Sequence, residues 1–411
     1  MKAFIKYIII GFIIVFFSIA FTSTHNIQSI DDISYVVALG IDIGEQSNLK
    51  VTFQFTKPTS TSGESGSSES APPIIDSIEA ESVDDAVNIM NTYTSKEINL
   101  SHCKLIVFSE ELAKKGIKEE IYSFTNKVQV RPDTNIVVST TSAKKYIESV
   151  KPSLENLVTK FYALLPNSSE YTGYTVNVEL GQFMNKIVSQ TGQPIAILGN
   201  IIEEGSTDFS TSSTSNSSNG NTNTSNENSQ GAKNGIENIG VAVFKHDKFV
   251  GTLTPNETLS YLITTGEVKS CNISVPDPQN ENNAIDLFFN FDNSPKINVY
   301  IINGTPYVTL KIKADARISS VEQISGRTSE KEIREIERSA SNYLSEQISH
   351  YLYKTSKELH SDISNLGKYS VKEFKTLPEF EEYEWLERYQ DAFFKVDCDV
   401  DVESGFLLVG S

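Results

Sequence analysis

Three aspartates alternate with apolar residues near the end of the sequence, at Asp397, Asp399 and Asp401. Their spacing matches the first ligands of a calcium-binding EF-hand loop, in which carboxylate oxygens surround the ion. In that register Val402 would stand where the loop needs a turn glycine, and Leu408 where it needs a bidentate glutamate. The sequence therefore predicts no calcium loop at these aspartates.

The same alternation is typical of a β-strand with one wet and one dry face. It extends through residues 393–402 (FFKVDCDVDV), so we expect a charged edge strand whose acidic face opposes aggregation between sheets. The acidic face would consist of Asp397, Asp399, Asp401 and Glu403, and the apolar face of Cys398, Val400 and Val402.

Other residues that could do chemistry are scattered. The sequence contains no phosphate loop, zincin motif or hydrolase elbow, and no Cys/His pair with the spacing of metal ligands. His350 and His360 share one expected helix, but ten residues of separation leave them about 80° out of alignment. The three cysteines, Cys103, Cys271 and Cys398, have no disulfide or zinc spacing and are expected to be small buried hydrophobes. We expect no catalytic residues, cofactor or metal.

The charge of the chain excludes one class of partner. It has 53 acidic and 35 basic side chains, a net charge of −18. This acidity repels phosphate backbones and anionic lipid, so we expect no nucleic-acid partner.

The first residues are strongly apolar. Residues 3–21 carry a single charge, Lys6, and as a helix would span about 28 Å, close to the ~30 Å hydrocarbon core of a bilayer. Lys2 and Lys6 lie on the amino side, so the positive-inside rule predicts that the rest of the chain is exported. A cleaved signal peptide, with Ser18 and Ala20 near the cleavage site, is the alternative. The residues expected to lie in a retained anchor include Ala3, Ile8, Ile14, Phe17 and Phe21.

Beyond this segment, strands alternate with short helices up to about residue 202, which indicates a mixed α/β domain. The fold class predicted for the chain is α+β or mixed α/β, with an N-terminal membrane helix followed by three small sheet-and-helix domains. The expected units are a transmembrane anchor (1–24), an N-terminal mixed α/β domain (25–203) with a flexible loop at 58–73, a disordered Ser/Asn/Thr-rich linker (204–236), a small ββα middle domain (237–282), and a C-terminal domain (283–411) of antiparallel strands with a long helix at 329–366.

Two expected helices have clear boundary signals. Thr254 is the N-cap of a helix that begins at Pro255 and ends at Gly266. Ser329 and Glu332 form a capping box at the start of the longest helix, which we expect to close at Gly367 with a possible break near 354–356.

Several stretches together resemble the Ger(x)C family, the C subunit of nutrient germinant receptors in the inner membrane of bacterial spores. They are ISYVVALGID, SHCKLIVFSEELAKKGI, PIAILGN, GVAVFKHDKFVGTLTPNETLSYL and WLERYQDAFFKVDCDVDV, in family order over nearly the whole chain. The resemblance implies a three-domain α/β protein on the outer face of the spore inner membrane, partnered with a polytopic A subunit and a transporter-like B subunit. It further implies a non-catalytic role in germination, with the small-molecule nutrient involved only indirectly, and offers no active-site residues to carry over.

The sequence departs from the family at its lipid site. Most members are lipoproteins cleaved before a cysteine that precedes a Trp-Asp pair, and here Thr24, His25 and Asn26 stand at that place. We therefore expect no lipidation and an uncleaved N-terminal helix as the tether. The alternative function is an exported solute-binding or hydrolase-like module with a cleft between its domains.

Overall fold

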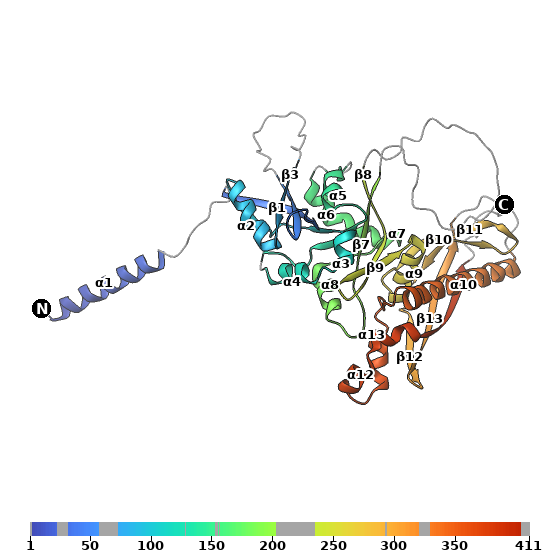
Figure 1. The fold of residues 1–411 in the computed structure, drawn as a ribbon. Helices are drawn as coiled ribbons and strands as arrows, with labels where there is room; N and C mark the ends of the chain where they lie inside the picture. The colour runs from blue at the N-terminus through green and yellow to red at the C-terminus, as the bar shows by residue number, and fades with distance from the viewer. Residues whose placement is uncertain are drawn as a thin grey trace, which may run out of the picture.

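The computed structural model describes residues 2–22, 32–56, 73–127, 129–152, 155, 157–202, 235–291, 294–319 and 329–403. The first helix, α1 (Lys2–Thr22), stands apart from the rest of the described chain (Figure 1). Of its side chains, those of residues 5–16 are described, and all are exposed. In the part of the chain that the structure describes, no helix has the length and apolar character of a membrane span.

A nine-stranded sheet forms the larger of two sheets (Figure 1). Its order is β3-β2-β1-β5-β6-β7-β8-β9, with β4 also paired to β1. The central strands β1, β5, β6 and β7 are parallel, and antiparallel pairs flank them on both sides. Both β5 and β6 are buried at every residue, as their unbroken apolar runs predict. The strands are β1 (Ile33–Ile43), β2 (Leu49–Phe55), β3 (Ile74–Ala80), β4 (Glu97–Asn99), β5 (Leu105–Ser109), β6 (Asn135–Ser139), β7 (Ile195–Ile202), β8 (Gly235–Lys245) and β9 (Lys248–Leu253).

Short helices pack around this sheet, and two glycines let one of them approach closely. A Cβ atom on Gly40 would lie 2.9 Å from Cδ1 of Ile147, and one on Gly199 would lie 2.6 Å from Cε2 of Tyr146. Both tyrosine and isoleucine belong to α5, which therefore lies directly against β1 and β7. The helices of this part are α2 (Val83–Tyr93), α3 (Glu110–Lys115), α4 (Lys118–Asn126), α5 (Ala143–Ser149), α6 (Val158–Leu164), the 3₁₀ turn η2 (Leu165–Ser168), α7 (Ser169–Thr172) and α8 (Leu180–Ile187).

Two stretches that the sequence predicts to be a flexible loop and a disordered linker lie mostly outside the described residues. Their described ends are informative. Phe55 at the end of β2 pairs with Ile74 at the start of β3, and Ile202 at the end of β7 pairs with Gly235 at the start of β8. Each stretch therefore connects two strands that pair with each other in antiparallel orientation.

A five-stranded sheet forms the C-terminal part, in which β13 pairs with both β11 and β12, and only β14 departs from the antiparallel strands predicted for this domain. Its order is β10-β11-β13-β12, and β14 pairs in parallel with the other edge of β13. Side chains on β13 and β14 alternate between exposed and buried, because one face packs on the core and the other faces solvent. The strands are β10 (Ser270–Asp277), β11 (Asn280–Asn290), β12 (Lys296–Ile302), β13 (Thr305–Ile318) and β14 (Phe393–Glu403).

The longest helix, α10 (Glu330–Tyr353), runs beside β14 and covers its free edge. Its Ser345 hydroxyl accepts a 3.1 Å hydrogen bond from the backbone N–H of Cys398, and its Ser341 hydroxyl accepts one of 3.1 Å from that of Val400. The Glu337 carboxylate accepts the N–H of Val402 at 3.1 Å. An edge strand whose outward donors are satisfied in this way is protected from pairing with another chain.

The expected helix over 329–366 is correct at its start and wrong at its end. Ser329 and Glu332 form the capping box, but α10 ends at Tyr353 and a π turn, η3 (Lys354–Glu358), follows at the predicted break. His360 then has a left-handed φ of 48°, and Gly367 begins a new helix instead of closing the old one. The later helices are α11 (Gly367–Ser370), η4 (Val371–Glu373), α12 (Leu377–Tyr383), α13 (Trp385–Arg388) and η5 (Tyr389–Asp391).

The segment expected as a ββα middle unit contains β8, β9 and α9 (Pro255–Thr265) in that order. Thr254 caps α9 and Gly266 ends it with a φ of 74°, so both predicted boundary signals are confirmed. The two strands, however, extend the larger sheet, and α9 packs on α10. Residues 237–282 are thus shared between the two sheets.

A buried polar junction joins the two parts. The Ser361 hydroxyl donates to the carbonyl of Phe244 on β8 at 2.6 Å, and the backbone N–H of Gln193 donates to the carbonyl of Asp362 at 2.8 Å. The hydroxyl of Thr191 donates to the Asn365 side chain at 2.8 Å. These bonds link β8 and the loop before β7 to the loop after η3, and so tie the larger sheet to the C-terminal part.

Candidate functional site

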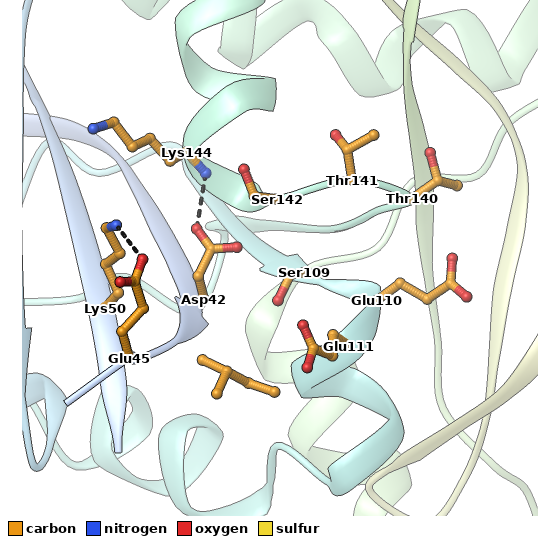
Figure 2. A pocket seen from close by; sticks show the side chains of 11 residues that line it. Asp42, Glu45, Lys50, Ser109, Glu110, Glu111, Thr140, Thr141, Ser142 and Lys144 are labelled. Carbon is orange, nitrogen blue, oxygen red and sulfur yellow. Dashed lines mark hydrogen bonds and ion pairs between the residues drawn. The ribbon is translucent and has the colours of Figure 1, made fainter. Parts of the chain in front are cut away.

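A polar pocket of about 380 Å³ opens where three parallel strands end (Figure 2). The carboxyl ends of β1, β5 and β6 meet at one edge of the larger sheet, and ligands of open α/β sheets bind in this kind of crevice. The lining residues are Asp42, Ile43, Glu45, Lys50, Ser109, Glu110, Glu111, Thr140, Thr141, Ser142 and Lys144.

Asp42 is the most buried of the charged groups in this pocket, with 7% of its surface exposed. Its carboxylate accepts hydrogen bonds from the backbone N–H groups of Ala143 (2.8 Å) and Lys144 (3.0 Å), at the start of α5. Burial raises the pKa of Asp42, and the hydrogen bonds from Lys144, Ala143 and the Ser109 hydroxyl oppose that rise. Asp42 therefore fastens β1 to a helix about a hundred residues further on.

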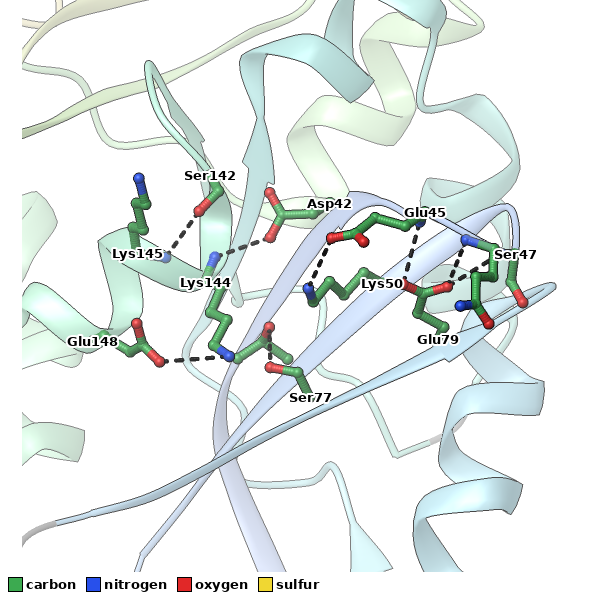
Figure 3. Close-up of polar contacts among 12 residues, drawn as sticks. Asp42, Glu45, Ser47, Lys50, Ser77, Glu79, Ser142, Lys144, Lys145 and Glu148 are labelled. Carbon is green, nitrogen blue, oxygen red and sulfur yellow. Dashed lines mark hydrogen bonds and ion pairs between the residues drawn. The ribbon is translucent and has the colours of Figure 1, made fainter.

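The rim of the pocket is held by a second carboxylate, Glu79 on β3 (Figure 3). It accepts the backbone N–H groups of Glu45 (3.2 Å), Gln46 (2.8 Å) and Ser47 (3.2 Å), in the turn between β1 and β2. These hydrogen bonds lower the pKa of the partly exposed Glu79. The fixed turn places Glu45 beside Lys50, whose ammonium lies 3.8 Å from its carboxylate.

This pocket presents hydroxyl, carboxylate and ammonium groups. Its hydroxyls already have partners: Thr140 donates to the Asn200 side chain at 2.8 Å, and Ser142 accepts the N–H of Lys145 at 3.1 Å. No histidine or cysteine lines it. Its carboxylates and two lysines would suit a small polar solute with both charges.

This pocket is not predicted from the sequence patterns described above. A signal was available, because Asp42, Ser109 and Thr140 each stand at or just after the end of a buried strand. Polar residues at the carboxyl ends of neighbouring parallel strands meet at one edge. The sequence does not state which strands are neighbours in the sheet, and without that order these residues cannot be placed together.

None of the site residues predicted from the sequence is among the residues that line this pocket. Ile8 and Ile14 are exposed on α1, at 57% and 60%. Ala3, Phe17 and Phe21 fall within the bounds of α1 but their side chains are not among those described, and Thr24 lies outside the described residues.

The expected strand with an acidic face is confirmed. Asp397, Asp399 and Asp401 are exposed on β14, whereas Cys398 is buried. In the described part of the chain, no three His, Cys, Asp or Glu side chains are grouped so that they could hold a metal ion.

All three cysteines are free and buried, as expected of small hydrophobes. Burial raises the thiol pKa to about 12 in Cys103 and Cys271 and to about 11 in Cys398. Thiols with such pKa values are protonated at neutral pH and unreactive.

Comparison with known proteins gives a consistent result. The family model for the spore germination protein N-terminal domain matches residues 26–201, and the model described as "Spore germination B3/ GerAC like, C-terminal" matches residues 239–405. Spore germination protein KC of Bacillus subtilis (strain 168) is 20% identical over 336 residues, which are 80% of this chain and 79% of that protein.

Among solved structures, the crystal structure of the GerBC protein is similar, with a TM-score of 0.50 and 15% identity. The match covers 89% of this chain and 96% of that chain, and at this identity it shows a shared mixed α+β fold. The chain belongs to the Ger(x)C family of spore germination proteins, the germinant-receptor C subunits. The family names describe spore germination proteins and not enzymes.

Proposed function

We propose that this protein is a membrane-anchored, non-catalytic C subunit of a nutrient germinant receptor, needed for assembly or signalling of that receptor. It would lie in the spore inner membrane, with the bulk of the chain on the outer face. The observation that supports this most is the match of both family domains, in order, to residues 26–201 and 239–405. Its partners would be the A and B membrane subunits, with no nucleic acid and only indirect contact with the nutrient.

The anchor would be an uncleaved helix over residues 3–21. A helix of 21 residues, the length of α1, extends about 31 Å, which matches the hydrocarbon thickness of a bilayer. The exposed isoleucines at Ile8 and Ile14 would then face lipid. Mass spectrometry of the protein from spore membranes should find residues 3–21 attached. A mature chain that begins near Phe21 would exclude the anchor.

The receptor role is tested by deleting the gene and measuring germination with a panel of single nutrients. We expect loss of the response to one nutrient or a few, and an unchanged response to a nutrient-independent trigger such as calcium dipicolinate. Affinity purification of the full chain from spores should bring down A and B subunits. Normal germination with every nutrient would contradict the proposal.

A second candidate function is exported solute binding, favoured by the polar pocket around Asp42. It predicts that a small zwitterion raises the melting temperature of the protein, and that Lys144→Gln weakens this shift. A panel of amino acids tested by thermal unfolding would separate the two functions. Neighbouring permease and ATPase genes would favour solute capture, whereas neighbouring A and B subunit genes would favour the receptor.

We also propose that the chain after the anchor divides into three domains.

A further inference from the structure

The loop after η3, residues 359–367, makes the polar contacts between the two parts of the molecule, and we call it the junction loop. Its Ser361, Asp362 and Asn365 form the hydrogen bonds that cross to the larger sheet. Near its two ends, His360 and Asn365 have left-handed backbones, with φ of 48° and 57°. Residues other than glycine seldom adopt such angles, so the closed loop keeps its shape only while it is packed in place.

Asp362 is fully buried in this loop, with 0% of its surface exposed. Its carboxylate accepts the backbone N–H groups of Leu366 at 3.0 Å and Gly367 at 2.9 Å, and the indole N–H of Trp385 at 2.8 Å. All three donors belong to the C-terminal part, so they can stay with the carboxylate when the loop moves away from the larger sheet. Opening the junction would then give the charge access to water without breaking its hydrogen bonds.

The titratable groups that act on Asp362 come from three elements. They are Lys186 of α8, Tyr351 of α10 and Tyr389 of η5. Burial raises the pKa of both tyrosines well above 10, so they stay neutral near pH 7. Among the described residues Asp362 has no ion pair, because Lys186 acts on it only through space. The charged form of Asp362 is therefore buried without a close cation.

Three further charged or titratable groups lie at the edge of the junction. Glu267, which follows α9, raises the pKa of Lys186, and Lys368 of α11 lowers it. His360 is exposed in the junction loop itself, and its Nδ1 lies 3.0 Å from the carbonyl oxygen of Ser356. Because histidine is the side chain that most often titrates near neutral pH, a test has to separate His360 from Asp362.

The burial of Asp362 links the junction to protons. A buried carboxyl group without a cation favours its neutral form, and burial raises the pKa of Asp362 from 3.8 to about 6. The closed junction therefore binds this proton more tightly than an open junction in which the carboxyl group is in water. By linkage, low pH favours the closed form, and the open form gains as the pH rises from about 4 through 6.

We propose that the junction loop is a pH-dependent contact between the two parts of the molecule, which opens locally when Asp362 loses its proton. Opening would loosen the C-terminal part from the larger sheet while both stay folded. With Asp362 of ordinary acidity in the open form, the ratio of open to closed molecules should rise about 50-fold between pH 4 and pH 7. The proposal goes beyond the receptor role and does not depend on it.

Amide hydrogen exchange of the full chain in detergent, followed by mass spectrometry, tests the proposal. After correction for the intrinsic exchange rate, peptides that cover residues 189–194 and 361–367 should lose about 50-fold in protection between pH 4 and pH 7. The buried strands β5 and β6 should remain better protected at each pH. Loop peptides that exchange only as fast as β5 would show that the junction opens by global unfolding alone, and this result, or protection independent of pH, would overturn the proposal.

Two pairs of variants identify the titrating group. Asp362→Asn should remove the pH dependence, whereas His360→Asn should keep it, because asparagine tolerates the left-handed backbone. Lys186→Met should move the midpoint to higher pH, because the Lys186 charge opposes the rise that burial causes in the pKa of Asp362. The matched control, Lys151→Met at an exposed position, should leave the midpoint unchanged.

The variants also decide against the proposal if it is wrong. A pH dependence that disappears in His360→Asn would assign the titration to the histidine, and an unmoved midpoint in Lys186→Met would exclude Asp362. Circular dichroism at pH 4 and pH 7 checks that each variant is folded. If Asp362→Asn does not fold, the Lys186 and His360 variants still give the answer.

Discussion

The indole Nε1 of Trp385 donates a hydrogen bond of 2.8 Å to Oδ2 of Asp362, and both side chains are buried. The Asp362 carboxylate also accepts the backbone N–H groups of Leu366 at 3.0 Å and Gly367 at 2.9 Å. Its own carbonyl accepts Gln193 from the loop before β7. One residue thus organises the loop after η3, holds α13 and contacts the larger sheet.

This carboxylate should make stability depend on pH. Burial raises the pKa of Asp362 from 3.8 to about 6, although hydrogen bonds from Leu366, Trp385 and Gly367 oppose the rise. The folded state then binds the proton more tightly than the unfolded chain. Its contribution to stability is therefore largest below about pH 4, and falls by on the order of 3 kcal/mol as the pH rises through 6.

Asp362→Asn isolates this effect. An amide does not titrate, so the difference in free energy of unfolding between the native protein and the variant should change between pH 4 and pH 6, about the window of the shifted pKa. The variant should be less stable at every pH because its NH₂ group cannot accept from Trp385 or Gly367. Urea unfolding at several pH values measures both. Parallel pH profiles would contradict the assignment.

Leu344→Asp should unfold the C-terminal part. Leu344 is 2% exposed on the apolar face of α10, and an aspartate there would be a buried charge without a partner. We expect a loss of about 4 kcal/mol or more in the free energy of unfolding. Asn342→Asp, at an exposed position of the same helix, is the control and should change little. Similar melting temperatures for the two variants would reject the burial of this face.

Lys354 links the end of α10 to the start of α9. Its ammonium lies 2.7 Å and 2.9 Å from the two carboxylate oxygens of Glu257, and both side chains are 23% exposed. Lys354→Met should cost about 1–2 kcal/mol, because a partly buried carboxylate loses its cation. The control is Lys331→Met, whose pair with Glu335 is exposed and should contribute close to nothing. If the two variants lost the same free energy of unfolding in chemical denaturation, the partly buried pair of Lys354 and Glu257 would contribute no more than an exposed pair.

The segment between β7 and β8 should be replaceable. Ile202 and Gly235 are already paired, so a short Asn-Gly turn can join them in place of residues 203–234. Shortening the loop from 32 residues to two, about sixteenfold, should stabilise the fold by up to about 2.4 kcal/mol. Differential scanning calorimetry measures this, and spores with the short turn should germinate normally. A protein that accumulates but fails to support germination would show that the segment is more than a spacer.

The cysteines should be inert in the folded protein. Their raised pKa values and burial predict no reaction with Ellman's reagent under native conditions, and three thiols per chain after unfolding. Fewer than three thiols after unfolding without reductant would indicate a disulfide and contradict the free state of Cys103, Cys271 and Cys398.

Local elements could be predicted well from the sequence. The capping residues Ser329 and Thr254 begin the helices that they were expected to begin, and the alternation over 393–402 is a strand with its aspartates in solvent. These features depend on hydrogen bonds within one turn and on the period of side chains along one strand. Residues close together in the sequence supply these hydrogen bonds and this period, so such elements can be predicted from the sequence alone.

The end of the long helix could not be predicted in the same way. The apolar pattern continues through Leu359 and Ile363, but the chain leaves the helix because Ser356 and Ser361 bond to Tyr389 and Phe244. Those partners lie more than thirty residues away in both directions. The spacing of apolar residues along the helix does not show these hydrogen bonds to distant residues.

The candidate site shows the same limit. Asp42 reaches its partners Ala143 and Lys144 only because β1 lies beside β5 and β6, in an order that the sequence does not state. The amino-acid sequence by itself determined the family, the acidic surface, the apolar first helix and most local elements. The tertiary structure alone decided that β8 and β9 extend the larger sheet and that Asp362 joins the two parts. Each of these depends on which distant strands pair, and pairing is settled by packing of the whole chain.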